Sequence, residues 1–150
     1  MFNICIRMTG NQAEAEDLLQ EAFLLAFKKI QQLKNPEQFG GWLRRIVVNE
    51  CIRHSRKALK TTEWQEQYSE SIADEETDWW TGIDLEMVHQ EIKNLPAGCR
   101  QVFVLYVLEE YTHKEVAVSM GISEGTSKSQ YQRARKILKQ RIMQKLNAHG

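Results

Sequence analysis

The sequence has 150 residues, enough for one domain or two small ones. Its twenty Lys and Arg residues balance twenty Asp and Glu residues, so the net charge alone predicts no partner. Cys5, Cys51 and Cys99 are odd in number and far apart, without a Cys-x-x-Cys pair, which argues against paired disulfides or a zinc site and favours a reduced cytoplasmic setting. The segment FNICI is too short for a secretory signal, and no stretch approaches the roughly 20 apolar residues of a membrane span, so we expect a soluble protein without membrane insertion.

The charges are distributed unevenly along the chain. Residues 1–60 carry ten basic and six acidic side chains, a net charge of +4. Residues 61–83 carry seven acidic and no basic ones (−7), and residues 84–150 carry ten basic and seven acidic ones (+3). This asymmetry is the main compositional clue to function, because basic segments suit negatively charged partners.

Residues 11–33 form the first strongly helical pattern. Acidic residues crowd its start and Lys28 and Lys29 its end, as the helix dipole favours, and Asn35-Pro36 breaks it. Its expected apolar stripe consists of Leu18, Leu19, Ala22, Phe23, Ala26, Phe27 and Ile30. A second helical pattern spans residues 39–58, with apolar positions at Trp42, Leu43, Ile46, Val47 and Ile52.

Residues 61–83 show no sustained period and many acids, and we interpret them as a flexible acidic linker. The pair Trp79-Trp80 is unusual in such a segment. It could anchor the linker to a partner, although packing on the next helix is the simpler interpretation.

The second half is also helical, so the predicted fold class is all-α. A helix is expected at residues 84–94, and Pro96 opens the next one. Thr112 to Glu115 form a capping box at the start of a short helix. Gly121 supplies a left-handed turn, and Ser123 caps the helix that follows. A short helix, a turn and a longer second helix form a helix-turn-helix, whose second helix enters the DNA major groove.

The second helix of this motif is strongly basic. From residue 128 to residue 150 there are seven Lys or Arg and no acid, which favours contact with DNA phosphates over a merely solvated face. Tyr131, Ala134, Leu138 and Ile142 fall on one stripe and should face the core. The candidate DNA-contacting residues are Thr126, Lys128, Ser129, Gln132, Arg133, Arg135 and Lys136.

Two motif blocks carry a family resemblance. The segments AEDLLQEAFLLAFKKI and FGGWLRRIVVNECIRHSRK precede the acidic linker, and LPAGCRQVFVLYVLEEYTHKEVAVSMGISEGTSKSQYQRARKILKQRI follows it. In this order they closely resemble the extracytoplasmic-function (ECF) sigma factors of bacterial RNA polymerase. The resemblance implies two small helical domains: residues 1–60 as sigma region 2, which binds polymerase and opens the minus-10 element, and residues 84–150 as sigma region 4, which reads the minus-35 element.

The resemblance also implies site residues and partners. Asp17, Gln20 and Glu21 match the D-x-x-Q-E signature of the helix that docks on the beta-prime coiled coil, and Leu18 and Leu24 accompany them. Asn49 matches the Asn at the minus-10 contact site, where the non-template strand is held single-stranded. The cationic track beside it consists of Arg44, Arg45, Arg53, Arg56 and Lys57. The implied partners are core polymerase (beta-prime coiled coil and beta flap), promoter DNA and an anti-sigma factor, with no cofactor and no metal.

The sequence departs from the family pattern at several points. The start at MFNICIRMTGN resembles the end of the family's first helix, so we expect region 2 to be truncated at its N-terminus. Ser127 stands where a buried Val is usual and Gln130 where Arg is usual. Glu110 replaces a customary Gly, which should strain the turn before the helix-turn-helix, and Arg53 replaces an acid or amide.

Three alternatives remain open. A stand-alone helix-turn-helix regulator explains residues 112–146 but leaves EDLLQEAF unexplained. A degenerate sigma paralogue would bind polymerase or an anti-sigma factor without initiating transcription. An enzyme has the least support, because the sequence has no H-E-x-x-H motif, no phosphate-binding Gly loop and no motif that pairs a nucleophile with a base.

Overall fold

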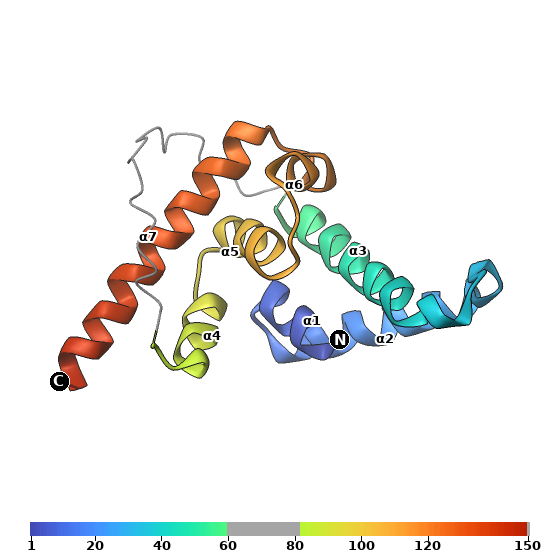
Figure 1. The fold of residues 1–150 in the computed structure, drawn as a ribbon, viewed down its shortest axis with the longest axis horizontal. Coiled ribbons are helices and arrows are strands. Elements are labelled where there is room, and N and C mark those ends of the chain that lie inside the picture. Colours follow the sequence, from blue (N-terminus) through green and yellow to red (C-terminus); the bar gives the residue numbers. More distant parts are fainter. Residues whose placement is uncertain (60–81, 150) are drawn as a thin grey trace. The chain divides into compact units, whose positions relative to one another are not determined.

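A computed structural model describes residues 1–59 and 82–149 of the chain (Figure 1). Every regular element in this part is helical, which confirms the all-α prediction. The chain divides into two compact units, Met1–Thr61 and Thr62–Gly150. Trp79-Trp80 and nearly all of the predicted linker lie outside the described residues.

The first unit contains α1 (Phe2–Thr9), α2 (Gln12–Lys28) and α3 (Phe39–Leu59). Gly10 ends α1 in the left-handed conformation (φ 68°), and Asn11 caps α2 by accepting a hydrogen bond from the Glu14 amide at 3.1 Å. The pattern predicted over residues 11–33 continues beyond α2 only as a 3₁₀ turn (Ile30–Gln32). A second 3₁₀ turn, Pro36–Gln38, begins at the predicted break and leads into α3.

The core of the first unit lies where α2 packs against α1 and α3. The buried side of α2 consists mainly of small residues, Ala15, Ala22 and Ala26 beside Leu18, so neighbouring helices can approach closely. The buried side chains that face them come from α1 (Ile4, Cys5, Met8) and from α3 (Leu43, Val47, Val48, Cys51, Ile52).

The second unit contains α4 (Leu85–Lys93), α5 (Ala97–Phe103), α6 (His113–Met120) and α7 (Glu124–His149), and α5 continues into a π-helical turn at Val104–Leu108. Both halves of the predicted capping box are present at Thr112 and Glu115. Gly121 is left-handed (φ 70°), and Ser123 accepts a hydrogen bond from the Thr126 amide at 3.0 Å. The predicted helix-turn-helix is therefore α6, this turn and α7.

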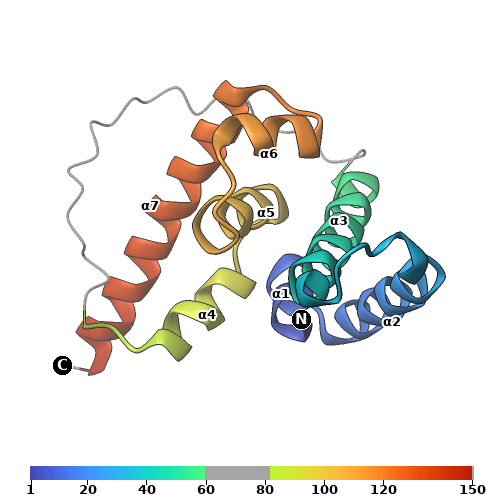
Figure 2. The same ribbon diagram turned by 45° about the vertical axis from the view of Figure 1, so that its right-hand side comes forward.

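The long helix α7 is the axis of the second unit, with α4, α5 and α6 packed along it (Figure 2). Ala134, Leu138 and Ile142 are buried, as their spacing predicted, and Tyr131 is half-buried. Within the described residues, no helix combines the length and the apolar character needed to cross a membrane.

Candidate functional site

The exposed face of α2 carries the predicted polymerase-binding residues Asp17, Gln20, Glu21 and Leu24, which lie three or four positions apart. Leu24 is 65% exposed. Leu18 is different, because it is only 5% exposed and packs in the core. Among the five predicted residues, the exposed ones are therefore acidic or polar apart from Leu24, and Leu18 lies beneath them in the core.

The apolar stripe predicted over residues 11–33 includes more residues than the structure buries. Phe23, Phe27 and Ile30 are exposed, and Phe27 is 79% exposed. The reason is geometric: the alanines and Leu18 fill the side that faces α1 and α3, and the aromatic positions fall on the neighbouring edge of the helix. Exposed aromatic and acidic side chains thus lie next to each other on α2. Periodicity alone had assigned the aromatic side chains to the core.

The exposed face of α3 carries all the predicted minus-10 residues: Arg44, Arg45, Asn49, Arg53, Arg56 and Lys57. Arg53 donates a hydrogen bond to the Glu50 carboxylate at 2.6 Å, which fixes its guanidinium beside the helix. Trp42 is half-buried, with its ring centroid 6.1 Å from that of Phe39, in keeping with the packing role that its spacing predicted.

An open cleft of about 730 Å³ lies between α2 and the C-terminal half of α3. One wall is cationic and polar, with Asn49, Arg53, Arg56 and Lys57, and Glu21 of α2 lines it from the other side. The fold thus brings a predicted polymerase contact, Glu21, next to the predicted minus-10 residues, a proximity that the separate motifs did not indicate.

Polar and aromatic side chains pack at the base of the helix-turn-helix. His113 Nδ1 lies 2.8 Å from the Ser127 hydroxyl, and the His113 ring stacks on Tyr106 with centroids 4.0 Å apart. Burial lowers the pKa of His113, and the nearby Lys128 lowers it further, although Glu124 opposes this. Ser127, which stands where a buried Val is usual in the family that the sequence resembles, is fully buried, and this contact with His113 satisfies its hydroxyl.

The predicted minus-35 residues divide into two groups by exposure. Lys128 and Lys136 are exposed, and Ser129, Gln132 and Arg133 are half-exposed. Thr126 is buried, and its hydroxyl accepts a hydrogen bond from Ser123 at 2.9 Å. Arg135 is also buried, with its guanidinium 5.6 Å from the centroid of the Tyr131 ring. The surface available to DNA is therefore narrower than the predicted set.

The C-terminal half of α7 directs two cations at α4. Arg141 donates a hydrogen bond to the Asn94 carbonyl at 3.0 Å, and Lys145 Nζ lies 2.5 Å from Glu91 Oε1. The Glu91 side chain is only 5% exposed. The basic run that begins at Lys128 thus changes its role along the helix: near the turn Lys128 is a surface charge, whereas near the C-terminus Arg141 and the exposed Lys145 bind the carbonyl of Asn94 and the buried carboxylate of Glu91.

Comparisons with known proteins cover both units. The family model "Sigma-70 region 2" matches residues 1–61, and "Sigma-70, region 4" matches residues 85–138. The ECF RNA polymerase sigma factor SigW of Bacillus subtilis is 32% identical over 154 residues, which cover 95% of this chain and 82% of SigW. The ECF RNA polymerase sigma factor SigM of the same organism is 30% identical over 147 residues, covering 93% of this chain and 86% of SigM.

A solved structure matches the fold over almost the whole chain. It is the sigma factor RpoE of Bartonella quintana, crystallised in complex with the anti-sigma factor NepR. The TM-score is 0.56 and the sequences are 25% identical, with 95% of this chain and 89% of the other covered.

Proposed function

This chain belongs to the ECF sigma factors of bacterial RNA polymerase, within the sigma-70 family, and we propose how its two units divide the work of such a factor. A sigma factor directs core polymerase to specific promoters and initiates transcription without catalysing a reaction itself. In the proposed division, residues 1–60 bind polymerase and open the minus-10 element, residues 84–150 read the minus-35 element, and residues 61–83 connect them. The match over residues 1–61 leaves the stand-alone regulator with less support.

The acidic face of α2 is the proposed polymerase-docking surface. Asp17, Gln20, Glu21 and Leu24 are exposed together, and this combination of carboxylates with one apolar side chain suits a basic coiled coil. Leu18 contributes indirectly, because its burial fixes α2 against the core. This exposed face is the observation that best supports the proposal.

The cationic face of α3 is the proposed minus-10 site. Arg44, Arg45, Arg53, Arg56 and Lys57 would follow the phosphates of the non-template strand, and Asn49 would bind an unstacked base at the rim of the cleft. Binding energy alone drives strand opening in this scheme, without ATP and without a covalent step.

The exposed N-terminal part of α7 is the proposed minus-35 reader. Lys128, Ser129, Gln132 and Arg133 would contact base edges, and Lys136 would contact a phosphate. Thr126 and Arg135 would support the helix from inside, because both are buried.

The partners proposed for the protein are core polymerase, through the beta-prime coiled coil and the beta flap, promoter DNA, and an anti-sigma factor like the one bound to the RpoE relative. The proposed site of action is the cytoplasm, where polymerase and promoters meet.

The decisive experiment measures binding of the full chain to bacterial core polymerase. The double substitution Asp17→Lys and Glu21→Lys should weaken binding by roughly 100-fold, because it places like charges against a basic partner. The same variant should bind a minus-35 DNA duplex as the unmodified chain does. A charge-matched control, Glu37→Lys with Glu86→Lys, changes two exposed carboxylates outside this face and should bind polymerase normally. Equal losses of polymerase and DNA binding in the Asp17/Glu21 variant would refute the proposal.

A further inference from the structure

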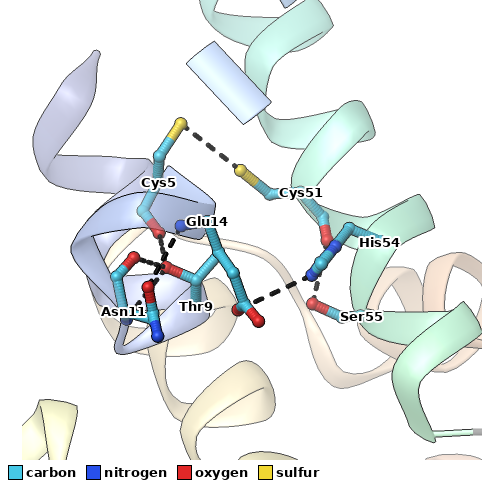
Figure 3. Close-up of polar contacts among 7 residues, drawn as sticks. All are labelled: Cys5, Thr9, Asn11, Glu14, Cys51, His54 and Ser55. Atoms are coloured by element: carbon cyan, nitrogen blue, oxygen red, sulfur yellow. Dashed lines mark hydrogen bonds and ion pairs between the residues drawn. The ribbon is translucent and has the colours of Figure 1, made fainter. Parts of the chain in front are cut away.

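Two cysteines that are far apart in the sequence meet in the core of the first unit. The Sγ atoms of Cys5 in α1 and Cys51 in α3 lie 3.7 Å apart, although the residues are 46 positions apart in the chain (Figure 3). Their exposed fractions are 0% and 1%, and neither is in a disulfide. The sequence predicted three separate thiols, so this proximity is a product of the tertiary fold.

The local geometry requires only a small movement to join the two sulfurs. A disulfide bond is about 2.05 Å long, so the sulfurs would approach by roughly 1.7 Å. Hydroxyl groups hold the backbone of both residues: Thr9 donates to the Cys5 carbonyl at 2.9 Å and Ser55 donates to the Cys51 carbonyl at 2.8 Å (Figure 3). The approach is therefore made by side-chain rotation and by a shift of the eight-residue helix α1, which Gly10 joins to α2.

The chemical environment distinguishes this pair from the third cysteine. The hydrogen bond from the Cys51 thiol lowers the pKa of Cys5, against the opposing effect of burial, and so increases the fraction of thiolate at Cys5. Burial raises the pKa of Cys99, whose thiol donates to Gln130 Oε1 at 3.1 Å. Cys99 belongs to the other unit and is the natural internal control.

We propose that Cys5 and Cys51 are an oxidative modification site, which forms a reversible intramolecular disulfide between α1 and α3 on exposure to a hydroperoxide. In the first step the Cys5 thiolate attacks one peroxide oxygen, the O–O bond breaks, and the protonated leaving group departs as water or an alcohol. In the second step the Cys51 sulfur attacks the resulting sulfenic acid, the S–S bond forms, and water leaves. The peroxide gains the two electrons that the two thiols lose, and a thiol reductant reverses the bond by exchange.

Burial sets the conditions under which this reaction occurs. Because both sulfurs are inaccessible in the closed unit, the oxidant has to be small and neutral and reach them when α1 opens locally. Hydrogen peroxide meets this requirement and is the probe for the test.

The test treats the native full chain with hydrogen peroxide, unfolds it, alkylates the remaining thiols and maps the peptides by mass spectrometry. The expected result is a cross-linked peptide that joins Cys5 to Cys51, the loss of both thiols from alkylation, an alkylated Cys99, and full recovery of all three thiols after treatment with dithiothreitol. The Cys99→Ser variant should give the same cross-link, and Cys51→Ser should give none.

Three results would overturn the proposal. One is that both thiols stay alkylatable at peroxide doses that oxidise free glutathione in the same tube. Another is that Cys5 or Cys51 gains oxygen atoms without forming the cross-link. The third is that the disulfide joins two chains or appears only when the protein is oxidised in denaturant.

Discussion

The two basic helices α3 and α7 use their positive charges differently. On α3 every predicted DNA-binding cation is exposed: Arg44, Arg45, Arg53, Arg56 and Lys57. On α7 the cations are divided, because Lys128 and Lys136 are exposed, Arg135 is buried, and Arg141 and Lys145 contact α4. A run of positive residues in a sequence therefore does not by itself measure the charge that a helix presents to DNA.

The difference follows from how many neighbours each helix has. In its unit α3 packs against α1 and α2 along one side, so the other side stays in water. In its unit α7 packs against α4, α5 and α6, and each of these helices covers a different part of the surface of α7. Cations that fall on these contacts are bound by carbonyls, carboxylates or aromatic rings, and only the remaining sector can read DNA.

The largest effect is expected where a cation of α7 pairs with a buried carboxylate. Lys145→Met should lower the free energy of unfolding of the second unit by about 2–3 kcal/mol, because it leaves Glu91 buried without its counter-charge. Urea denaturation followed by circular dichroism measures the change.

Two further variants isolate the effect of the ion pair. Lys139→Met removes an exposed charge from the same helix and should change stability by less than about 0.5 kcal/mol. Adding Glu91→Leu to Lys145→Met should recover part of the loss, since no buried charge then remains. Equal small effects of Lys145→Met and Lys139→Met would mean that the pair does not hold α4 to α7.

The next effect concerns the cations of α7 that are open to water. Lys128→Ala and Arg133→Ala should each weaken binding of the polymerase holoenzyme to promoter DNA by about 1–3 kcal/mol, since each loses a contact near the start of the recognition helix. Fluorescence anisotropy at fixed salt measures the affinity. Lys139→Ala, farther along the helix, should cost less, and unchanged affinity in both principal variants would show that a different face of α7 meets DNA.

Arg135 tests the division within α7 directly. Arg135→Met keeps an apolar stem but removes the guanidinium from the Tyr131 ring, so we expect a loss of stability of about 1 kcal/mol. Promoter affinity, measured well below the melting temperature, should stay the same. A fall in affinity as large as that of Lys128→Ala, without a change in stability, would place Arg135 among the DNA contacts.

Local chemistry explains which features could be predicted from the sequence. The capping box at Thr112, the left-handed Gly121 and the buried stripe of Ala134, Leu138 and Ile142 depend on residues within a few positions of each other, and all are present. The separation of exposed from buried faces on α3 was equally predictable, because one side of that helix carries the apolar residues and the other the cations.

The features that the sequence did not predict depend on contacts between distant segments. Phe23 and Phe27 lie in an apolar pattern but are exposed, because alanines and Leu18 occupy the side of α2 that packs against α1 and α3. The burial of Thr126 and Arg135 depends on the neighbours of α7 in its unit, and the meeting of Cys5 and Cys51 depends on the packing of α1 on α3. No periodicity within one helix contains this information.

The smallest expected effect lies in the turn that precedes the helix-turn-helix. Glu110 has φ 60°, the one positive value for a non-glycine residue in the part of the chain that the structure describes, whereas the left-handed residues that end α1 and α6 are glycines, Gly10 and Gly121. Glu110→Gly should raise the free energy of unfolding of the second unit by about 0.5–1 kcal/mol, because glycine adopts this conformation without the clash of a Cβ atom. Glu110→Gln removes the same charge but keeps the Cβ atom, so the midpoint of urea denaturation should rise for Gly relative to Gln. If the two variants unfold at the same urea concentration, the left-handed conformation of Glu110 does not destabilise the second unit, and the turn that positions α6 carries no strain.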